Sequence, residues 1–223
     1  MQLPWVWRRV LRPSFVLLEQ SRSPSAFAVY LTRTWMASKD PMCVRFGRRQ
    51  LSIRPCTPDL SVVVRCFTGE FAAPIAAAKP LRHKLIIDAG GYIGTAAIAF
   101  AEAFPEARIV TLEPSLDNFA ILERNVRAYP NIVPLNKALG VTECAVPLRN
   151  RGTGEWGFST VQEPADCPTA AMLHTVPVTT IQALMQEFGA SGIDLLKLDI
   201  EGAEFEILNA PHAWLANTCV LFA

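Results

Sequence analysis

Apolar runs and amphipathic stretches alternate along the chain from Leu85 onward. Runs of strand length are Leu85–Ile87, Arg108–Leu112, Ile132–Leu135, Ile193–Leu198 and Cys219–Ala223. Segments that favour helices lie between them at Ile93–Ala103, Ser115–Ala128, Thr180–Phe188 and Ala203–Asn209. Because strands and helices alternate over short connections, the pattern predicts an α/β fold with a doubly wound, mostly parallel sheet and helices on both faces.

Other segments depart from this rhythm. Extended pieces are expected at Ala145–Leu148 and His174–Val178, two short strands at Gln50–Ile53 and Leu60–Val64, and a helix at Ala72–Pro80. Four prolines break residues 1–45, which favours short helical pieces there. We therefore expect a basic helical and strand extension over residues 1–50 and one α/β domain over residues 51–223.

Charge is unevenly distributed. Residues 1–55 hold ten Arg or Lys and two acids, whereas the rest of the chain holds eleven basic and eighteen acidic residues. The overall net charge of +1 argues against a dedicated nucleic-acid binder. For the basic start a solvated helical arm is favoured, and the alternatives are an organellar transit peptide or a helix on a membrane surface. A weak membrane-surface contact through this arm is retained as an expectation.

The six cysteines are scattered, without a C-x-x-C pair or zinc-ligand spacing. Reduced thiols in the cytoplasm are the expected reading, and no metal site is expected. No apolar run approaches the length of a membrane-spanning helix. The cysteines and hydropathy therefore indicate a globular cytoplasmic protein.

The stretch Asp88–Gly94 joins the first expected strand to the following helix and contains three glycines. Glycines in such a turn let backbone approach a ligand, and ligands of open α/β sheets bind at the carboxyl ends of the strands. The dinucleotide pattern G-x-G-x-x-G fails at Tyr92, and the carboxylate of Asp88 would repel a pyrophosphate. Glu113 ends the next strand, where a carboxylate accepts from ribose hydroxyls. A ligand with an amine, a sulfonium and a ribose but no phosphate fits better, which indicates S-adenosylmethionine and a methyltransferase.

A second group of acids follows the strand Ile193–Leu198. Asp199 and Glu201 lie at its carboxyl end and are the candidate catalytic bases, because an alcohol nucleophile must lose a proton. Glu204 begins the next helix, where capping and substrate binding are equally favoured. Trp156, in a polar glycine-rich loop, is the other candidate for substrate binding, and packing on the sheet edge is its equally weighted alternative.

These motifs, in this order, resemble those of FkbM-type methyltransferases: Asp88–Gly94, Leu112–Pro114, Asn136–Gly140, Val178–Ile181 and Leu196–Glu204. The resemblance covers about Arg54 to Trp214, and the family usually has Ala-Asn where this chain has Gly91-Tyr92. It implies the class I, Rossmann-like fold, the cofactor S-adenosyl-L-methionine, and O-methyl transfer to a sugar or polyketide hydroxyl. The predicted cofactor-binding residues are Asp88, Gly90, Gly91, Tyr92, Gly94, Glu113 and Asn118.

Two other functions stay open. One is a Rossmann-type NAD(P)-dependent oxidoreductase, against which the broken glycine pattern counts. The other is a non-catalytic module, because class I sheets normally continue beyond the fifth strand and the C-terminal strands are expected to be missing from this chain. A glycan or small-molecule substrate is the expected partner, with no nucleic acid.

Overall fold

The computed structural model describes residues 12–21, 23–79, 85–150, 158–159, 171–200, 202–210 and 213–223. The chain forms two compact units that divide between Glu70 and Phe71. The boundary that we expected at residue 50 falls within a strand of the first unit, because β2 (Arg49–Ile53) pairs antiparallel with β1 (Met42–Phe46). The first unit therefore ends at Glu70, beyond the basic stretch of residues 1–55.

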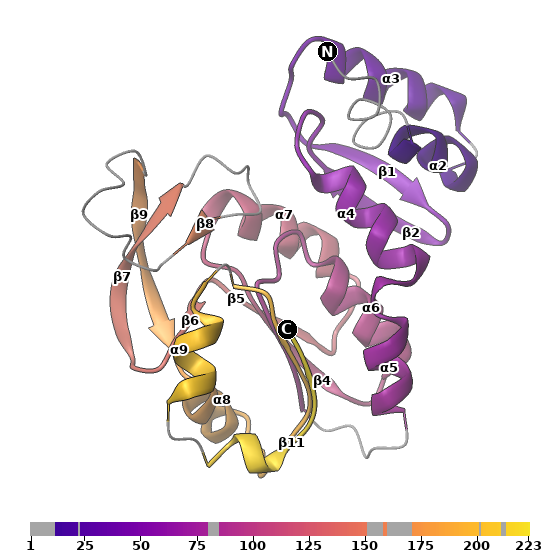
Figure 1. Ribbon diagram of the computed structural model, residues 1–223. Helices are drawn as coiled ribbons and strands as arrows, with labels where there is room; N and C mark the ends of the chain where they lie inside the picture. The colour runs from indigo at the N-terminus through magenta and orange to yellow at the C-terminus, as the bar shows by residue number, and fades with distance from the viewer. Residues whose placement is uncertain are drawn as a thin grey trace. The chain divides into compact units, whose positions relative to one another are not determined.

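The first unit is built from helices around the β1–β2 hairpin (Figure 1). Its other elements, in chain order, are α2 (Arg12–Ser21), α3 (Pro24–Trp35), α4 (Asp59–Arg65) and a π-helical turn over Cys66–Glu70. The strand β1 was not predicted from the sequence. Its buried side chains, Met42, Val44 and Phe46, alternate with exposed ones, and five residues of alternation between prolines and turns gave too short a signal.

The predicted strand at Leu60–Val64 is wrong, because these residues belong to the helix α4. A run of β-branched residues favours a strand, but a buried carboxylate decides the local structure here. Asp59 accepts hydrogen bonds from the backbone N–H of Arg54 at 2.8 Å and from its guanidinium at 3.0 Å to each oxygen. This bidentate pair fixes the chain at the start of the helix, so that Leu60 and Val63 are buried on one face.

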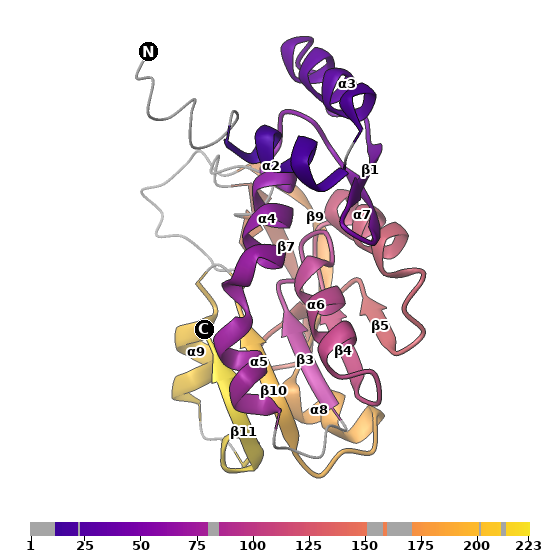
Figure 2. The ribbon, with the colours of Figure 1, turned by 90° about the vertical axis from the view of Figure 1, so that its right-hand side faces the viewer.

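The second unit contains a five-stranded parallel sheet of order β11-β10-β3-β4-β5, which confirms the predicted fold class (Figure 2). Its strands are β3 (Leu85–Ala89), β4 (Arg108–Leu112), β5 (Ile132–Leu135), β10 (Ile193–Leu198) and β11 (Thr218–Phe222). The chain winds outward from β3 in one direction and then, from β10, in the other. The order of strands therefore reverses between β3 and β10, and ligands of such sheets bind at the carboxyl ends beside that reversal.

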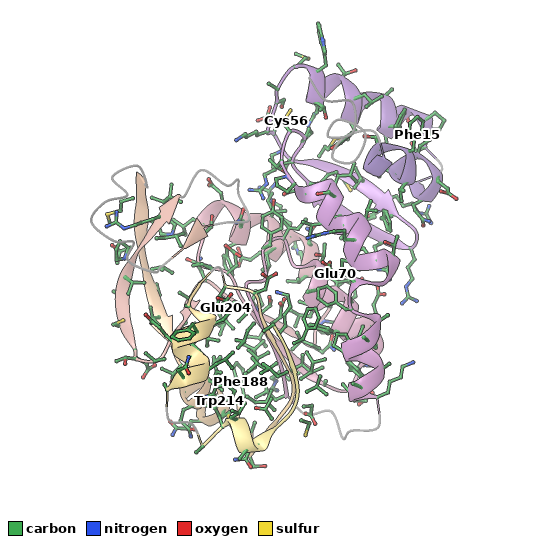
Figure 3. The ribbon with its side chains drawn as sticks, viewed as in Figure 1. Phe15, Cys56, Glu70, Phe188, Glu204 and Trp214 are labelled. Carbon is green, nitrogen blue, oxygen red and sulfur yellow. The ribbon has the colours of Figure 1, made fainter. Side chains whose placement is uncertain are left out.

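Helices cover both faces of this sheet (Figure 1). They are α5 (Ala72–Ala78), α6 (Thr95–Ala103), α7 (Leu116–Val126), α8 (Ile181–Glu187) and α9 (Glu204–Asn209). On one face α8 and α9 pack on the sheet in a core that includes Trp214, and Phe188 packs against it (Figure 3). On the other face α5 and α6 lie against the strands, with Phe71 and Phe100 in edge contact. Both faces are apolar because a parallel sheet is buried on each side.

A second, four-stranded sheet of order β6-β9-β7-β8 was not expected. It consists of β6 (Ala138–Leu139), β7 (Cys144–Asn150), β8 (Phe158–Ser159) and β9 (Ala171–Thr179). The extended pieces that the sequence predicted are β7 and β9, which pair antiparallel over a small core of their own. Their pairing joins residues far apart in the chain, which local periodicity does not reveal.

Within the described residues no single helix is long and apolar enough to cross a membrane. Two consecutive segments, Asp59–Glu70 and Ala72–Ala78, are long and apolar enough only when they are taken together, and the chain bends between them. The expected membrane-surface contact of the basic arm stays a prediction, since residues 1–11 lie outside the described part of the chain.

Candidate active site

Three polar side chains form a row across the carboxyl ends of the central strands. The strand register places Lys197 of β10 beside Asp88 of β3, and Asp88 beside Thr111 of β4. Thr111 donates its hydroxyl hydrogen to Asp88 Oδ2 at 2.8 Å, and Lys197 Nζ lies 3.1 Å from Asp88 Oδ1 as an ion pair. All three residues are buried, and the ammonium of Lys197 compensates the charge of Asp88 inside the sheet. Asp88 Oδ1 has this ion pair as its partner and accepts no hydrogen bond from the described part of the chain.

Asp88 was predicted to face the cofactor. The structure places its side chain fully out of solvent, with both oxygens directed at Thr111 and Lys197. A direct contact between this carboxylate and a ligand stays a prediction. What the structure does show is that Asp88 holds a lysine, and that lysine was not among the predicted site residues. Little in the sequence singles out Lys197 as a site residue, because a single Lys inside an apolar strand has no local partner.

The glycine turn is required by packing within the protein. A Cβ on Gly90 (φ +79°) would overlap the backbone carbonyl oxygen of Asp199, and one on Gly91 would overlap Thr111 Oγ1. The amides of Gly90 and Gly91 both donate to the carbonyl of Leu112, at 3.0 and 2.8 Å. Close approach of backbone was expected here, and the partners that the structure shows are the ends of β4 and β10 themselves.

Gly94 has a related role at the start of α6. It has a left-handed φ of +84°, and a Cβ there would meet Val126 Cγ1 at 2.9 Å. It therefore lets α6 pack closely against α7. Tyr92 has φ +51°, a conformation that costs a bulky residue energy and that Asn tolerates better. Tyr92 is thus one of the two residues that depart from the usual FkbM pattern, and it is held in a left-handed conformation.

Glu113 is buried at the end of β4 and faces the glycine turn. Its Oε2 accepts the N–H of Tyr92 at 2.8 Å, and its Oε1 accepts the N–H of Ser115 at 2.9 Å and Nδ2 of Asn118 at 3.3 Å. Burial raises the pKa of Glu113 to about 7, although these hydrogen bonds counteract the rise. Asn118, predicted to contact the cofactor, here supports Glu113.

The helix that follows Glu113 begins at Leu116, one residue after the start of the predicted segment Ser115–Ala128. Ser115 is the N-cap of α7, and its side chain accepts the N–H of Asn118. The carbonyl of Pro114 accepts Asn136 Nδ2 at 3.2 Å and lies 3.0 Å from His174 Nε2. These contacts hold the segment after β4 between α7 and the second sheet.

Asp199 and Glu204 lie beyond the end of β10. The side chain of Asp199 is 68% exposed, and its Oδ2 lies 3.6 Å from Lys197 Nζ. Glu204 accepts the backbone N–H of Ile200 at 2.8 Å and of Gly202 at 2.7 Å, one on each oxygen. Glu204 therefore organises the turn into α9, while its predicted contact with a substrate stays a prediction.

Glu201, the second candidate base, and Trp156, the other candidate for substrate binding, lie outside the described residues. Of the predicted set, the structure brings together Asp88, the glycine turn, Glu113, Asn118 and Asp199 around the reversal between β3 and β10. Among the described residues, no three His, Cys, Asp or Glu side chains gather as metal ligands.

The charges at the carboxyl ends of β3, β4 and β10 favour a cation over an anion. Lys197 is opposed by Asp88 and Asp199, and the carboxyl group of Glu113 lies behind the same turn. A pyrophosphate would meet these acids, whereas a sulfonium or ammonium group would be attracted. The residues present therefore fit S-adenosylmethionine better than a dinucleotide.

The fold is Rossmann-like, and acidic side chains gather at the carboxyl ends of its central strands. The sequence matches the Methyltransferase FkbM domain over residues 88–219, which is more than half of the chain. The chain belongs to this family of methyltransferase domains.

Comparison with curated proteins gave no match. Among solved structures, the chain is similar to the crystal structure of the SAM-dependent methyltransferase from Agrobacterium tumefaciens, with 13% identity and a TM-score of 0.34. The match covers 44% of this chain and 33% of that one.

Proposed function

We propose that this protein is an S-adenosylmethionine-dependent O-methyltransferase that acts on a hydroxyl of a glycan or small, polyketide-like molecule. The observation that carries the proposal is the position of Glu113 and Asp199. Glu113 is buried at the end of β4, behind the glycine turn, and Asp199 is exposed at the end of β10, on the other side of β3. This arrangement supports a cofactor site and an accessible carboxylate at the same edge of the sheet.

When bound, the cofactor supplies an electrophilic methyl group on a sulfonium. The protein's part is to bind and orient the acceptor and to remove its proton. Glu113 retains acceptor capacity for ribose hydroxyls, because its two oxygens offer about four lone-pair sites and accept three hydrogen bonds here. Asp199 is proposed as the base, since its carboxylate is exposed at the end of β10, beside the glycine turn. Glu201 is retained as a second candidate from the sequence.

Calorimetry tests the cofactor assignment. We expect the protein to bind S-adenosylhomocysteine and not NAD⁺, and Glu113→Ala to weaken this binding. The reverse preference would replace the proposal with the oxidoreductase alternative.

Incorporation of radiolabelled methyl groups into glycan and small-molecule extracts tests the reaction. Asp199→Asn is expected to lower turnover while leaving affinity for S-adenosylhomocysteine close to that of the parent protein. If turnover by Asp199→Asn equals that of the parent protein, Asp199 is not the base. Binding of S-adenosylhomocysteine without methyl transfer to any extract would favour the non-catalytic module.

We also propose the cytoplasm as the compartment. Support comes from the scattered cysteines of the sequence, which have no C-x-x-C pair and no zinc-ligand spacing.

A further inference from the structure

Lys197 is a buried cation at the point where the strand order reverses. Its side chain is 4% exposed, and its Nζ lies within 3.6 Å of four oxygen atoms. Two are the carboxylate oxygens of Asp88 and Asp199. The others are backbone carbonyls of the glycine turn, which accept from Nζ at 3.2 Å (Ala89) and 3.0 Å (Gly90).

These contacts leave Lys197 no role as a proton acceptor. Burial by itself would lower the pKa of this ammonium, but the charges of Asp88 and Asp199 outweigh it and raise the pKa above the usual value. A protonated lysine has three N–H donors and no acceptor. With four oxygens around it, the ammonium is committed to holding the protein's own atoms.

The backbone carbonyls that Lys197 holds belong to the cofactor turn. The carbonyl of Ala89 accepts from both Lys197 Nζ and the N–H of Asp199, at 3.2 Å in each case. Lys197 Nζ also holds the next carbonyl, that of Gly90. The same Gly90 packs so closely on Asp199 that an added Cβ would overlap the Asp199 carbonyl oxygen. A single ammonium thus fixes the turn after β3 against the end of β10.

We propose that Lys197 is the positioning residue of the cofactor turn, and that Asp88 acts on the site by anchoring Lys197 instead of touching the cofactor. The inference rests on the proposed function, since the turn is taken to bind S-adenosylmethionine. It assigns a role to a lysine that the chemistry of methyl transfer does not use.

A cycle of three variants tests the proposal: Asp88→Asn, Lys197→Met and the double variant. Lys197→Met leaves the carboxylate of Asp88 buried without its counter-charge, so its unfolding temperature should fall. The double variant has neither charge and keeps similar side-chain volumes, so most of that loss should be recovered. Thermal unfolding measures both effects.

The decisive readout is affinity for S-adenosylhomocysteine, measured by calorimetry on the same proteins. A purely structural pair predicts that the double variant, once stable, binds like the parent protein. If Lys197 positions the turn, the double variant should bind S-adenosylhomocysteine at least about tenfold more weakly than the parent protein, because the turn has lost its anchor. Asp88→Asn should weaken binding in the parent background and have no further effect in the Lys197→Met background.

Asp194→Ala is the matched control. Asp194 lies on the same strand β10 and accepts the N–H of Leu85 of β3 at 3.0 Å, at the opposite end of the two strands. Removing this contact should lower the unfolding temperature without changing affinity for S-adenosylhomocysteine. A fall in affinity here would show that any weakening of the β3–β10 pair disturbs the site, which contradicts a specific role for Lys197.

Three further results would overturn the proposal. They are parent-like affinity of the double variant, parent-like affinity of Asp88→Asn, and losses from the two single variants that multiply in the double variant. The last would mean that Asp88 contacts the ligand independently. Absence of binding by the parent protein would contradict the proposed function instead, and the unfolding temperatures would still report whether Asp88 anchors Lys197.

Discussion

Lys197 and Asp88 are neighbours in the register of two parallel strands, and their side chains form an ion pair of 3.1 Å in the interior of the sheet. Removal of one member of a buried pair is far more costly than the net contribution of the pair, because the other charge is left without compensation. The two residues therefore work as a unit, and Thr111 completes it by donating to the second oxygen of Asp88.

Thr111→Val tests the hydroxyl of this unit. The substitution keeps the volume but leaves Asp88 Oδ2 without its hydrogen bond, so the free energy of unfolding should fall by about 1.5–3 kcal/mol. Thr111→Ser keeps a donor and should recover part of the loss. Chemical denaturation measures both values, and a Thr111→Val variant as stable as the parent protein would show that the hydroxyl does not matter.

Gly90→Ala tests the steric requirement of the turn. Its Cβ would overlap the carbonyl oxygen of Asp199 in a left-handed conformation, so we expect a loss of at least about 3 kcal/mol in the free energy of unfolding. Gly189→Ala is the matched control. Gly189 also has a positive φ, of +61°, but nothing lies within 4 Å of its added Cβ.

The control should therefore cost only the conformational penalty, about 1–2 kcal/mol. Similar losses at the two positions would mean that the turn can move away from β10 without difficulty.

Stability should depend on pH through Glu113. Its pKa is about 7 in the folded protein against 4.5 as an ordinary value, so the folded state binds the proton more tightly. Its stabilising contribution is complete below about pH 4.5 and is lost as the pH rises through about 7. A difference of this size corresponds to at most about 3 kcal/mol.

Glu113→Gln removes this titration. The free energy of unfolding of the variant, relative to the parent protein, should therefore increase between pH 5 and pH 8 in denaturation experiments. A difference that stays constant over that range would show that Glu113 is already ionised in the acid range.

Glu204→Ala tests the turn after β10. The variant loses both bonds to the amides of Ile200 and Gly202, and should lose about 1 kcal/mol of stability. Glu206→Ala removes another acid from the first turn of α9 without removing these two bonds, so it serves as the control. Hydrogen exchange of the Ile200 and Gly202 amides should accelerate only in Glu204→Ala, and unchanged exchange would contradict the role of Glu204 in the turn.

The sequence by itself determined the parallel sheet and the edge that carries the site. Apolar runs gave all five of its strands, and the acids Glu113 and Asp199 follow two of those runs directly. The N-cap at Ser115 was also predictable, since capping depends on residues within one helical turn. These features depend on local periodicity and on the rule that parallel strands end at a common edge.

Tertiary structure alone decided which polar groups meet. Lys197 and the carbonyl of Ala89 are separated by 108 positions in the chain, and only the pairing of β10 with β3 brings them into contact. The same holds for the glycines, whose close neighbours come from other strands and helices. At Leu60–Val64 the Arg54–Asp59 pair overrode a local strand preference. Long-range pairing and burial, which a local pattern does not encode, made Asp88 the anchor of a lysine.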